Sequence, residues 1–290
     1  MKILIHKPGL LTTIQDDGRL SGMHIGIPQS GFMDRQSAHI ANKLVGNKIN
    51  QPLLEMTFSG PEIEFTDEVM FAITGADMTP TLNNKLIKCY ESYESKKGDV
   101  LRLGFAKCGT RAYLAFSGMI DVSEMYGSFS TYLPGKFGGK DGKQLNKGDV
   151  ISIQSNSIKQ KTERIDIDTL KIDHNEVQSI KILKGPEFSI LDADCIKLLK
   201  NQLFTINSES NRVGYRLKGH SILRNPINSI ISSPTMRGVV QLPNNGLPIV
   251  LMSDSPTIGG YPRIGVCTSQ SCDLLAQLKT NDQIQFDIID

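Results

Sequence analysis

The sequence predicts a mainly β protein with a few helices, arranged as two domains. Short segments rich in β-branched and aromatic residues recur along the chain and are separated by Gly, Pro, Asn and Asp. This spacing is typical of sandwiches and barrels. Helical periodicity is rare. At 290 residues the chain is long enough for two medium-sized cores.

Ten segments have the composition that favours strands, bounded by turn residues. They are 1–6, 69–74, 99–105, 111–118, 149–154, 179–184, 203–207, 238–242, 248–254 and 283–289. Because they are short and closely spaced, we expect antiparallel sheets or barrels rather than a parallel sheet with crossover helices.

The clearest predicted helix covers 34–45. Asp34 can cap its first turn, and Gly46 follows its last one. Its apolar face contains Ala38, Ala41, Leu44 and Val45. Weaker periodicity predicts helices over 190–200 and 272–278.

Landmarks in the first half of the chain recur in the second. GPEIEF (60–65) resembles GPEFSI (185–190), and three further pairs follow in the same order. These are FAIT and FTIN, YLAFSG and IVLMSD, and KGDVISI and NDQIQFDI. Two copies favour a duplicated β unit over a solenoid, although strands can also look alike by chance. We therefore expect a first domain at 1–155, a linker or exposed edge at 156–178 and a second domain at 179–290.

Composition excludes several classes of function. The chain has 32 basic and 30 acidic side chains, so we expect no electrostatic nucleic-acid footprint. Its five cysteines lack zinc-ligand spacing, and their odd number suits reduced thiols. The N-terminus does not resemble a signal peptide, and no apolar run reaches 18 residues. We expect a soluble, cytoplasmic protein that binds no membrane.

LMSDSPTIGGYPRIGV (251–266) is the stretch with the strongest functional pattern. It lacks the lysine and helix of a nucleotide-binding P-loop. Gly259 and Gly260 would let the backbone approach a ligand, with Tyr261 and Arg263 as planar and charged contacts. The alternative is a glycine turn that only closes a barrel corner.

Two further motifs carry arginines. In QDDGR (15–19), Arg19 could contact a ligand or another protein chain, or pair with a neighbouring aspartate on the surface. In NRVGYRL (211–217), Arg212 and Arg216 would share one face of an extended segment, with functional and solvated interpretations both open. We expect His39 to pack or to lie at the surface, and Cys267 to be a buried strand thiol.

Several strings identify a family resemblance that runs essentially end to end. They are GLLTTIQDDGR, GIPQSGFMDRQSAHIANKLVGN, LLEMTFSGPEIEF, ITGADM, NRVGYRLKG and GVVQLPNNGLPIVLM followed by TIGGYPRIG. The chain resembles the KipA and PxpC family, the C subunits of bacterial ATP-dependent 5-oxoprolinases, which is related to half of the carboxyltransferase domain of urea carboxylase. The resemblance implies cyclophilin-like β-barrel domains, an amide or lactam substrate, and KipI/PxpB-like and PxpA-like partner subunits. It also implies ATP, bound by or shared with a partner subunit. The sequence itself predicts no metal.

Opening a lactam with ATP requires cations or N–H groups for phosphate and carboxylate, and a carboxylate that positions water. With the resemblance, this requirement suggests three catalytic carboxylates: Asp77, Asp121 and Asp254. The expected substrate-binding residues are Arg19, Asp34, Arg35, Arg212, Tyr215, Arg216, Gln241, Thr257, Gly259, Gly260, Tyr261 and Arg263.

The chain departs from the family pattern at Met119, Ser123, Phe129, Ser255, Pro256 and Ile258. Phe129 and Ser255 stand where arginines are usual, so two guanidinium groups are missing. Two alternatives therefore stay open. One is a regulatory KipA-like protein that binds and antagonises a KipI-like kinase inhibitor. The other is a biotin-dependent carboxyltransferase-like protein acting on a urea-like amide, which would need a separate biotin carrier because the chain has no Met-Lys-Met string.

Overall fold

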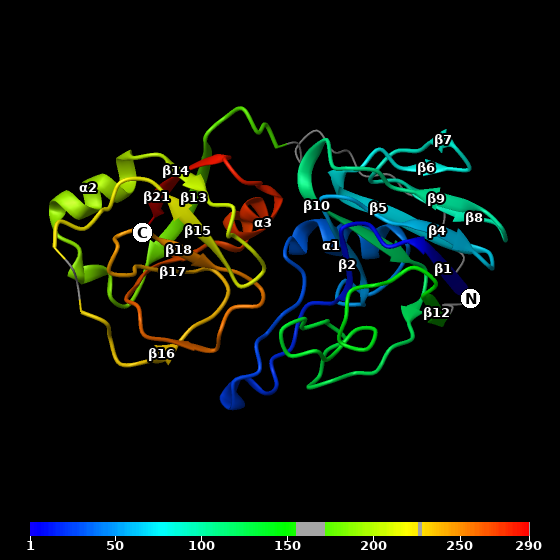
Figure 1. The fold of residues 1–290 in the computed structure, drawn as a ribbon, viewed down its shortest axis with the longest axis horizontal. Helices are drawn as coiled ribbons and strands as arrows, with labels where there is room; N and C mark the ends of the chain where they lie inside the picture. The colour runs from blue at the N-terminus through cyan, green and yellow to red at the C-terminus, as the bar shows by residue number, and fades with distance from the viewer. Residues whose placement is uncertain (155–171, 226–227, 290) are drawn as a thin grey trace. The chain divides into compact units, whose positions relative to one another are not determined.

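The computed structural model of the chain describes residues 1–154, 172–225 and 228–289. The chain forms two compact units (Figure 1). The first contains Met1–Arg19 and Ser30–Ile172, and the second contains Leu20–Gln29 and Asp173–Asp290. Strands dominate both units, and the described residues form three α-helices. The prediction of a mainly β protein with a few helices is confirmed.

The first unit contains two sheets. Its seven-stranded sheet has the order β11 (Met119–Ile120), β12 (Val150–Gln154), β1 (Lys2–Lys7), β4 (Glu62–Phe65), β9 (Val100–Arg102), β6 (Thr81–Leu82) and β7 (Lys85–Leu86). Its five-stranded sheet has the order β2 (Leu11–Gln15), β3 (Leu53–Thr57), β10 (Cys108–Phe116), β5 (Val69–Asp77) and β8 (Ser92–Ser95). Alternate residues of these strands point inward, and residues from both sheets form one core that includes Ile3, Ile63, Phe71 and Leu114.

The helix α1 (Arg35–Leu44) covers the other face of the five-stranded sheet, packing on β5 and β10. Asp34 caps it, because its Oδ1 accepts a hydrogen bond from Ser37 N at 2.9 Å. The helix ends before Gly46, whose φ of 74° suits glycine. All four residues of the predicted apolar face are buried, together with Tyr113 of β10. The helix prediction is confirmed.

The second unit is a closed barrel with the strand order β13 (Gln178–Lys184), β20 (Arg263–Cys267), β17 (Val239–Gln241), β18 (Ile249–Leu251), β15 (Gly214–Lys218), β14 (Phe204–Ile206) and β21 (Gln283–Ile289). It carries α2 (Ala193–Asn201) and α3 (Ser269–Gln277), close to the two weaker helix predictions. A separate two-stranded ribbon pairs β16 (Ser233–Pro234) with β19 (Ile258–Gly259). The described residues of this unit also form 3₁₀ turns at Met23–Ile25 and Phe188–Ile190.

Three of the four repeated landmarks contribute strands in both halves, and the first pair differs. GPEIEF supplies β4, whereas GPEFSI forms the 3₁₀ turn Phe188–Ile190. β5 and β10 pair directly, but their proposed counterparts β14 and β18 are separated by β15. The expected pair of barrels is therefore seen as one two-sheet unit and one closed barrel. Most of the predicted linker lies outside the described residues, so that boundary stays a prediction.

A candidate ligand pocket and two buried aspartate clusters

The segments QDDGR (15–19) and GSFST (127–131) contact each other in the first unit through Asp16, which is 5 % exposed. Asp16 Oδ1 accepts hydrogen bonds from the hydroxyls of Ser128 at 2.6 Å and Ser130 at 2.5 Å, and from Gly18 N at 2.9 Å. Oδ2 accepts one from Phe129 N at 2.7 Å. We call these residues the Asp16 cluster. Four neutral donors compensate for the loss of water around the carboxylate.

Arg19 is fully buried, which excludes the alternative of a surface ion pair. Its Nη2 donates to the Ser130 carbonyl, and its guanidinium lies 4.9 Å from the centroid of the Phe137 ring. Such a cation–π contact adds to the packing of the loop that follows β11. Asp17 Oδ1 lies 2.7 Å from Nε2 of His39, which is partly buried in α1.

Asp34 and the following Arg35 mark the start of α1. The Asp34 carboxylate accepts from both the backbone N and the hydroxyl of Ser37. The Asp34 backbone N donates to the Tyr113 hydroxyl at 2.7 Å, and that hydroxyl donates to Glu55 Oε2 at 3.0 Å. Burial raises the pKa of Tyr113 well above its usual value. The Asp34 carboxylate therefore serves the helix cap, and its predicted role toward a ligand stays untested.

The three carboxylates predicted to be catalytic are not brought together within either unit. Asp77 ends β5, and its Oδ1 accepts from Thr79 N at 2.8 Å. Asp121 follows β11, and its Oδ1 accepts from Gln154 Nε2 at 3.0 Å. Both are exposed, and no contact within the described residues joins them. Asp254 belongs to the second unit.

Asp254 forms a buried ion pair with Arg212. Arg212 Nε donates to Asp254 Oδ2 at 2.9 Å, and Nη2 donates to Oδ1 at 3.0 Å. The two residues are 8 % and 4 % exposed. Arg212 precedes β15, so strand alternation does not place it on the face of Arg216. Tyr215, also predicted to bind substrate, is buried, with its hydroxyl 3.5 Å from the Leu278 carbonyl. The geometry engages both oxygens of Asp254 with an arginine.

Arg263 is held in a similar way. Its Nε and Nη2 donate to the carboxylate of Glu187 at 2.9 and 2.6 Å, and its Nη1 donates to the Pro234 carbonyl at 3.0 Å. Hydrogen bonds from Arg263 hold the pKa of Glu187 below its usual value. This arginine therefore connects β20 to the 3₁₀ turn and to the ribbon strand β16.

The paired glycines of TIGGYP differ in what surrounds them. A Cβ on Gly259 would overlap Nε2 of Gln241, so a larger residue here would displace the end of that side chain. The Gln241 Nε2 atom is buried and has no hydrogen-bond partner among the described residues. A Cβ on Gly260 would meet nothing closer than 3.5 Å. Thr257 contributes its carbonyl to Thr235 N at 2.9 Å, which extends the ribbon.

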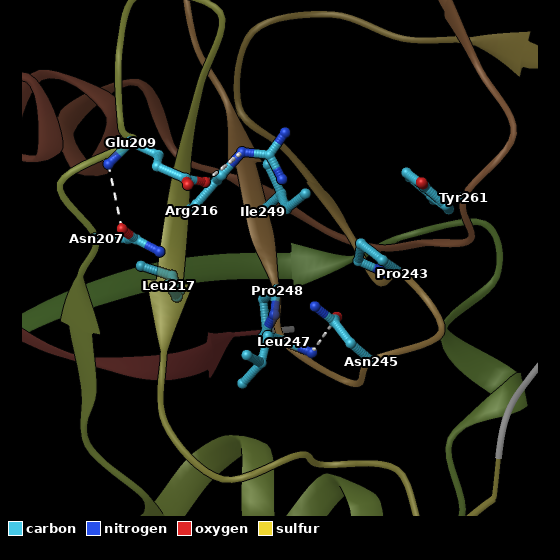
Figure 2. Close-up of a pocket in the computed structure, with 10 residues that line it drawn as sticks. All are labelled: Asn207, Glu209, Arg216, Leu217, Pro243, Asn245, Leu247, Pro248, Ile249 and Tyr261. Carbon is cyan, nitrogen blue, oxygen red and sulfur yellow. Dashed lines mark hydrogen bonds and ion pairs between the residues drawn. The ribbon is translucent and has the colours of Figure 1, made fainter.

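A pocket of about 260 Å³ opens beside β15 and β18 and contains two predicted binding residues, Arg216 and Tyr261 (Figure 2). It is lined by Asn207, Glu209, Arg216, Leu217, Pro243, Asn245, Leu247, Pro248, Ile249 and Tyr261. Sequence reasoning missed Asn207, Glu209 and Asn245. Asn207 ends the predicted strand 203–207, and Glu209 and Asn245 stand in turns beside predicted strands, where polar residues are common whether or not a ligand is bound.

We next consider metal-ligating side chains and thiols among the described residues. The described residues contain no group of three or more His, Cys, Asp or Glu side chains placed to hold a metal ion. Cys267 is a buried thiol of β20, as predicted. A hydrogen bond with Cys272 and burial raise the pKa of Cys267 well above its usual value, so it is a poor nucleophile.

The fold and the matched sequence define a carboxyltransferase-type protein. A model of the carboxyltransferase domain, subdomains A and B, matches residues 25–288, and the chain belongs to that family. It is 36% identical to the C subunit of 5-oxoprolinase from Escherichia coli, over 97% of this chain and 89% of that protein. It is 32% identical to the urea amidolyase of Saccharomyces cerevisiae, over 98% of this chain but 16% of that protein.

The crystal structure of the Kluyveromyces lactis urea amidolyase superposes with a TM-score of 0.91 at 29% identity. The match covers 100% of this chain and 19% of that one. The chain thus spans most of the bacterial protein and less than a fifth of the two yeast proteins. Within the described residues, none of the helices has the length and apolar character needed to cross a bilayer.

Proposed function

We propose that the chain is the C subunit of an ATP-dependent 5-oxoprolinase, which hydrolyses 5-oxo-L-proline to L-glutamate with KipI/PxpB-like and PxpA-like subunits. The observation that carries this proposal is the match to the Escherichia coli protein, which is nearly full-length on both sides. The yeast urea amidolyases match only as small parts of much longer chains. A relative of matching length is therefore the better functional guide.

The residues of this chain suit a supporting role in that reaction. Two of its predicted binding arginines, Arg212 and Arg263, are engaged by carboxylates, and TIGGYP forms the ribbon strand β19 and a bend instead of a strand, loop and helix. We therefore assign ATP binding to a partner protein, or to a site shared with one.

The proposal is tested by mixing this chain with its KipI/PxpB-like and PxpA-like partners, 5-oxo-L-proline and ATP. Glutamate and ADP are expected only when all three proteins and ATP are present. Mixtures that each lack one component are the matched controls, and the Escherichia coli proteins serve as the positive control. The proposal would be contradicted if the complete mixture released no glutamate under conditions in which the positive control is active.

A second candidate function is regulatory, in which the chain binds and antagonises a KipI-like kinase inhibitor. The buried ion pair at Asp254 favours this candidate, because a carboxylate with both oxygens bound to Arg212 is poorly placed to activate water. The absence of arginine at Phe129 and Ser255 points the same way. Tyr261→Ala should then bind a KipI-like partner as tightly as the native chain. Loss of that binding would favour a direct role of the ribbon loop.

A further inference from the structure

The three arginines predicted to bind ligand in the second unit differ in how they are engaged. Arg212 and Arg263 each donate to a carboxylate at 2.6 to 3.0 Å. Arg216 Nε lies 3.9 Å from Glu209 Oε2, which is beyond hydrogen-bond distance. The two side chains are 56 % and 73 % exposed, so their attraction is screened by water. Of these three arginines, Arg216 is the one whose donors can be given to an anionic ligand.

The turns around Arg216 add two amide donors. Asn207 Oδ1 accepts from Glu209 N at 3.1 Å, and Asn245 Oδ1 accepts from Leu247 N at 3.1 Å. These bonds occupy the amide oxygens and leave the NH₂ groups to donate. Figure 2 shows both side chains at the pocket, with Asn245 in the connection between β17 and β18. The polar lining is therefore rich in donors, and Glu209 is its one acidic side chain.

The remaining lining is apolar and small. Pro243, Pro248 and Ile249 are among its apolar lining residues, and Ile249 is the register partner of Arg216 across β15 and β18. Tyr261 stands on the other side of Pro243 in Figure 2, at the edge of the pocket. A volume of about 260 Å³ suits a metabolite of few atoms. Proline rings and a β-branched side chain suit contact with a compact ring.

We propose that this pocket binds a small ring compound carrying a carboxylate and a neighbouring carbonyl. Arg216 pairs with the carboxylate, Asn245 donates to the carbonyl oxygen, and Pro243 and Ile249 contact the ring. Glu209 competes with the ligand for Arg216. The inference rests on the proposed function, which makes 5-oxo-L-proline the member of this class to test.

The test is calorimetric titration of the full chain with 5-oxo-L-proline, and with two compounds that each lack one group. 2-Pyrrolidinone lacks the carboxylate, and L-proline lacks the lactam carbonyl. We expect 5-oxo-L-proline to bind more tightly than either. Arg216→Gln should weaken its binding by about tenfold or more, because a charge-assisted bond is lost. Glu209→Gln should strengthen binding several-fold by removing the competing carboxylate.

Arg224→Gln is the matched control, because Arg224 is an exposed arginine of the same unit that pairs with Asp194 outside the pocket. It should change affinity by less than about twofold. Absence of 5-oxo-L-proline binding, equal binding of 2-pyrrolidinone, or native affinity in Arg216→Gln would overturn the pocket assignment. The three-protein turnover assay reports separately on the proposed function. Turnover that is unaffected by Arg216→Gln would contradict the assignment of this pocket as the ligand site, and it would leave the proposed 5-oxoprolinase function intact.

Discussion

Asp16 in the first unit and Asp254 in the second are both buried aspartates, but their charges are stabilised in different ways. Asp16 accepts from two hydroxyls and two backbone N–H groups. Asp254 accepts two bonds from Arg212. Neutral donors can be removed one at a time, whereas removal of the arginine leaves a buried charge without a counterion. Substitutions at the two buried aspartates should therefore lower stability by different amounts.

The largest loss of stability is expected from breaking the ion pair between Arg212 and Asp254. Arg212→Met should lower the free energy of unfolding by about 3–5 kcal/mol, because Asp254 is left buried and unpaired. Urea denaturation measures the loss. The double variant Arg212→Met with Asp254→Leu should recover most of it, since no charge then remains. A double variant as unstable as Arg212→Met would show that the pair contributes through packing instead of charge.

A smaller effect is expected in the Asp16 cluster. Asp16→Asn keeps the side-chain shape but turns an NH₂ group toward groups that are themselves donors, so it should cost about 2 kcal/mol of unfolding free energy. Ser128→Ala and Ser130→Ala should each cost about 1 kcal/mol. The same urea titration measures all three. Native stability of Asp16→Asn would contradict this account of the cluster.

The smallest effect concerns Glu187 and Arg263, which are more accessible than Arg212 and Asp254. Glu187→Gln should cost about 1 kcal/mol at neutral pH. Because the pKa of Glu187 is lowered in the folded state, its contribution is present above the unfolded-state pKa and is lost as the pH falls through the folded-state pKa. The stability difference between native chain and variant should therefore shrink below about pH 4.5. A difference that grows on acidification would refute this assignment.

Local patterns predicted the helix at 34–45 well. Capping by Asp34 and the apolar face that packs on β10 depend on residues three or four positions apart, which the sequence displays directly. The positions of most strands were predicted for the same reason. Their pairing was not, because strand order depends on contacts between distant segments. Thus β15 lies between β14 and β18, an order that the sequence does not display.

The candidate site was predicted in residue type more than in arrangement. Arg216 and Tyr261 line one pocket, and their binding of a ligand stays a prediction. Arg212 and Asp254 were expected to face substrate, and the structure pairs them with each other across 42 positions of sequence. A sequence can show that a cation and a carboxylate are present. It cannot show that they neutralise one another, because that depends on a contact made only in the folded barrel.

The sequence by itself determined the β-rich class, the capped helix and the family. These features follow from short-range periodicity, backbone restrictions and motif strings that survive in linear order. Tertiary structure alone decided which charged groups remain available. Burial and pairing set that outcome, and they join residues such as Asp16 and Ser130 that lie 114 positions apart. The donors of Arg216 remain available because Glu209 Oε2 lies 3.9 Å from Arg216 Nε and both side chains are exposed to solvent.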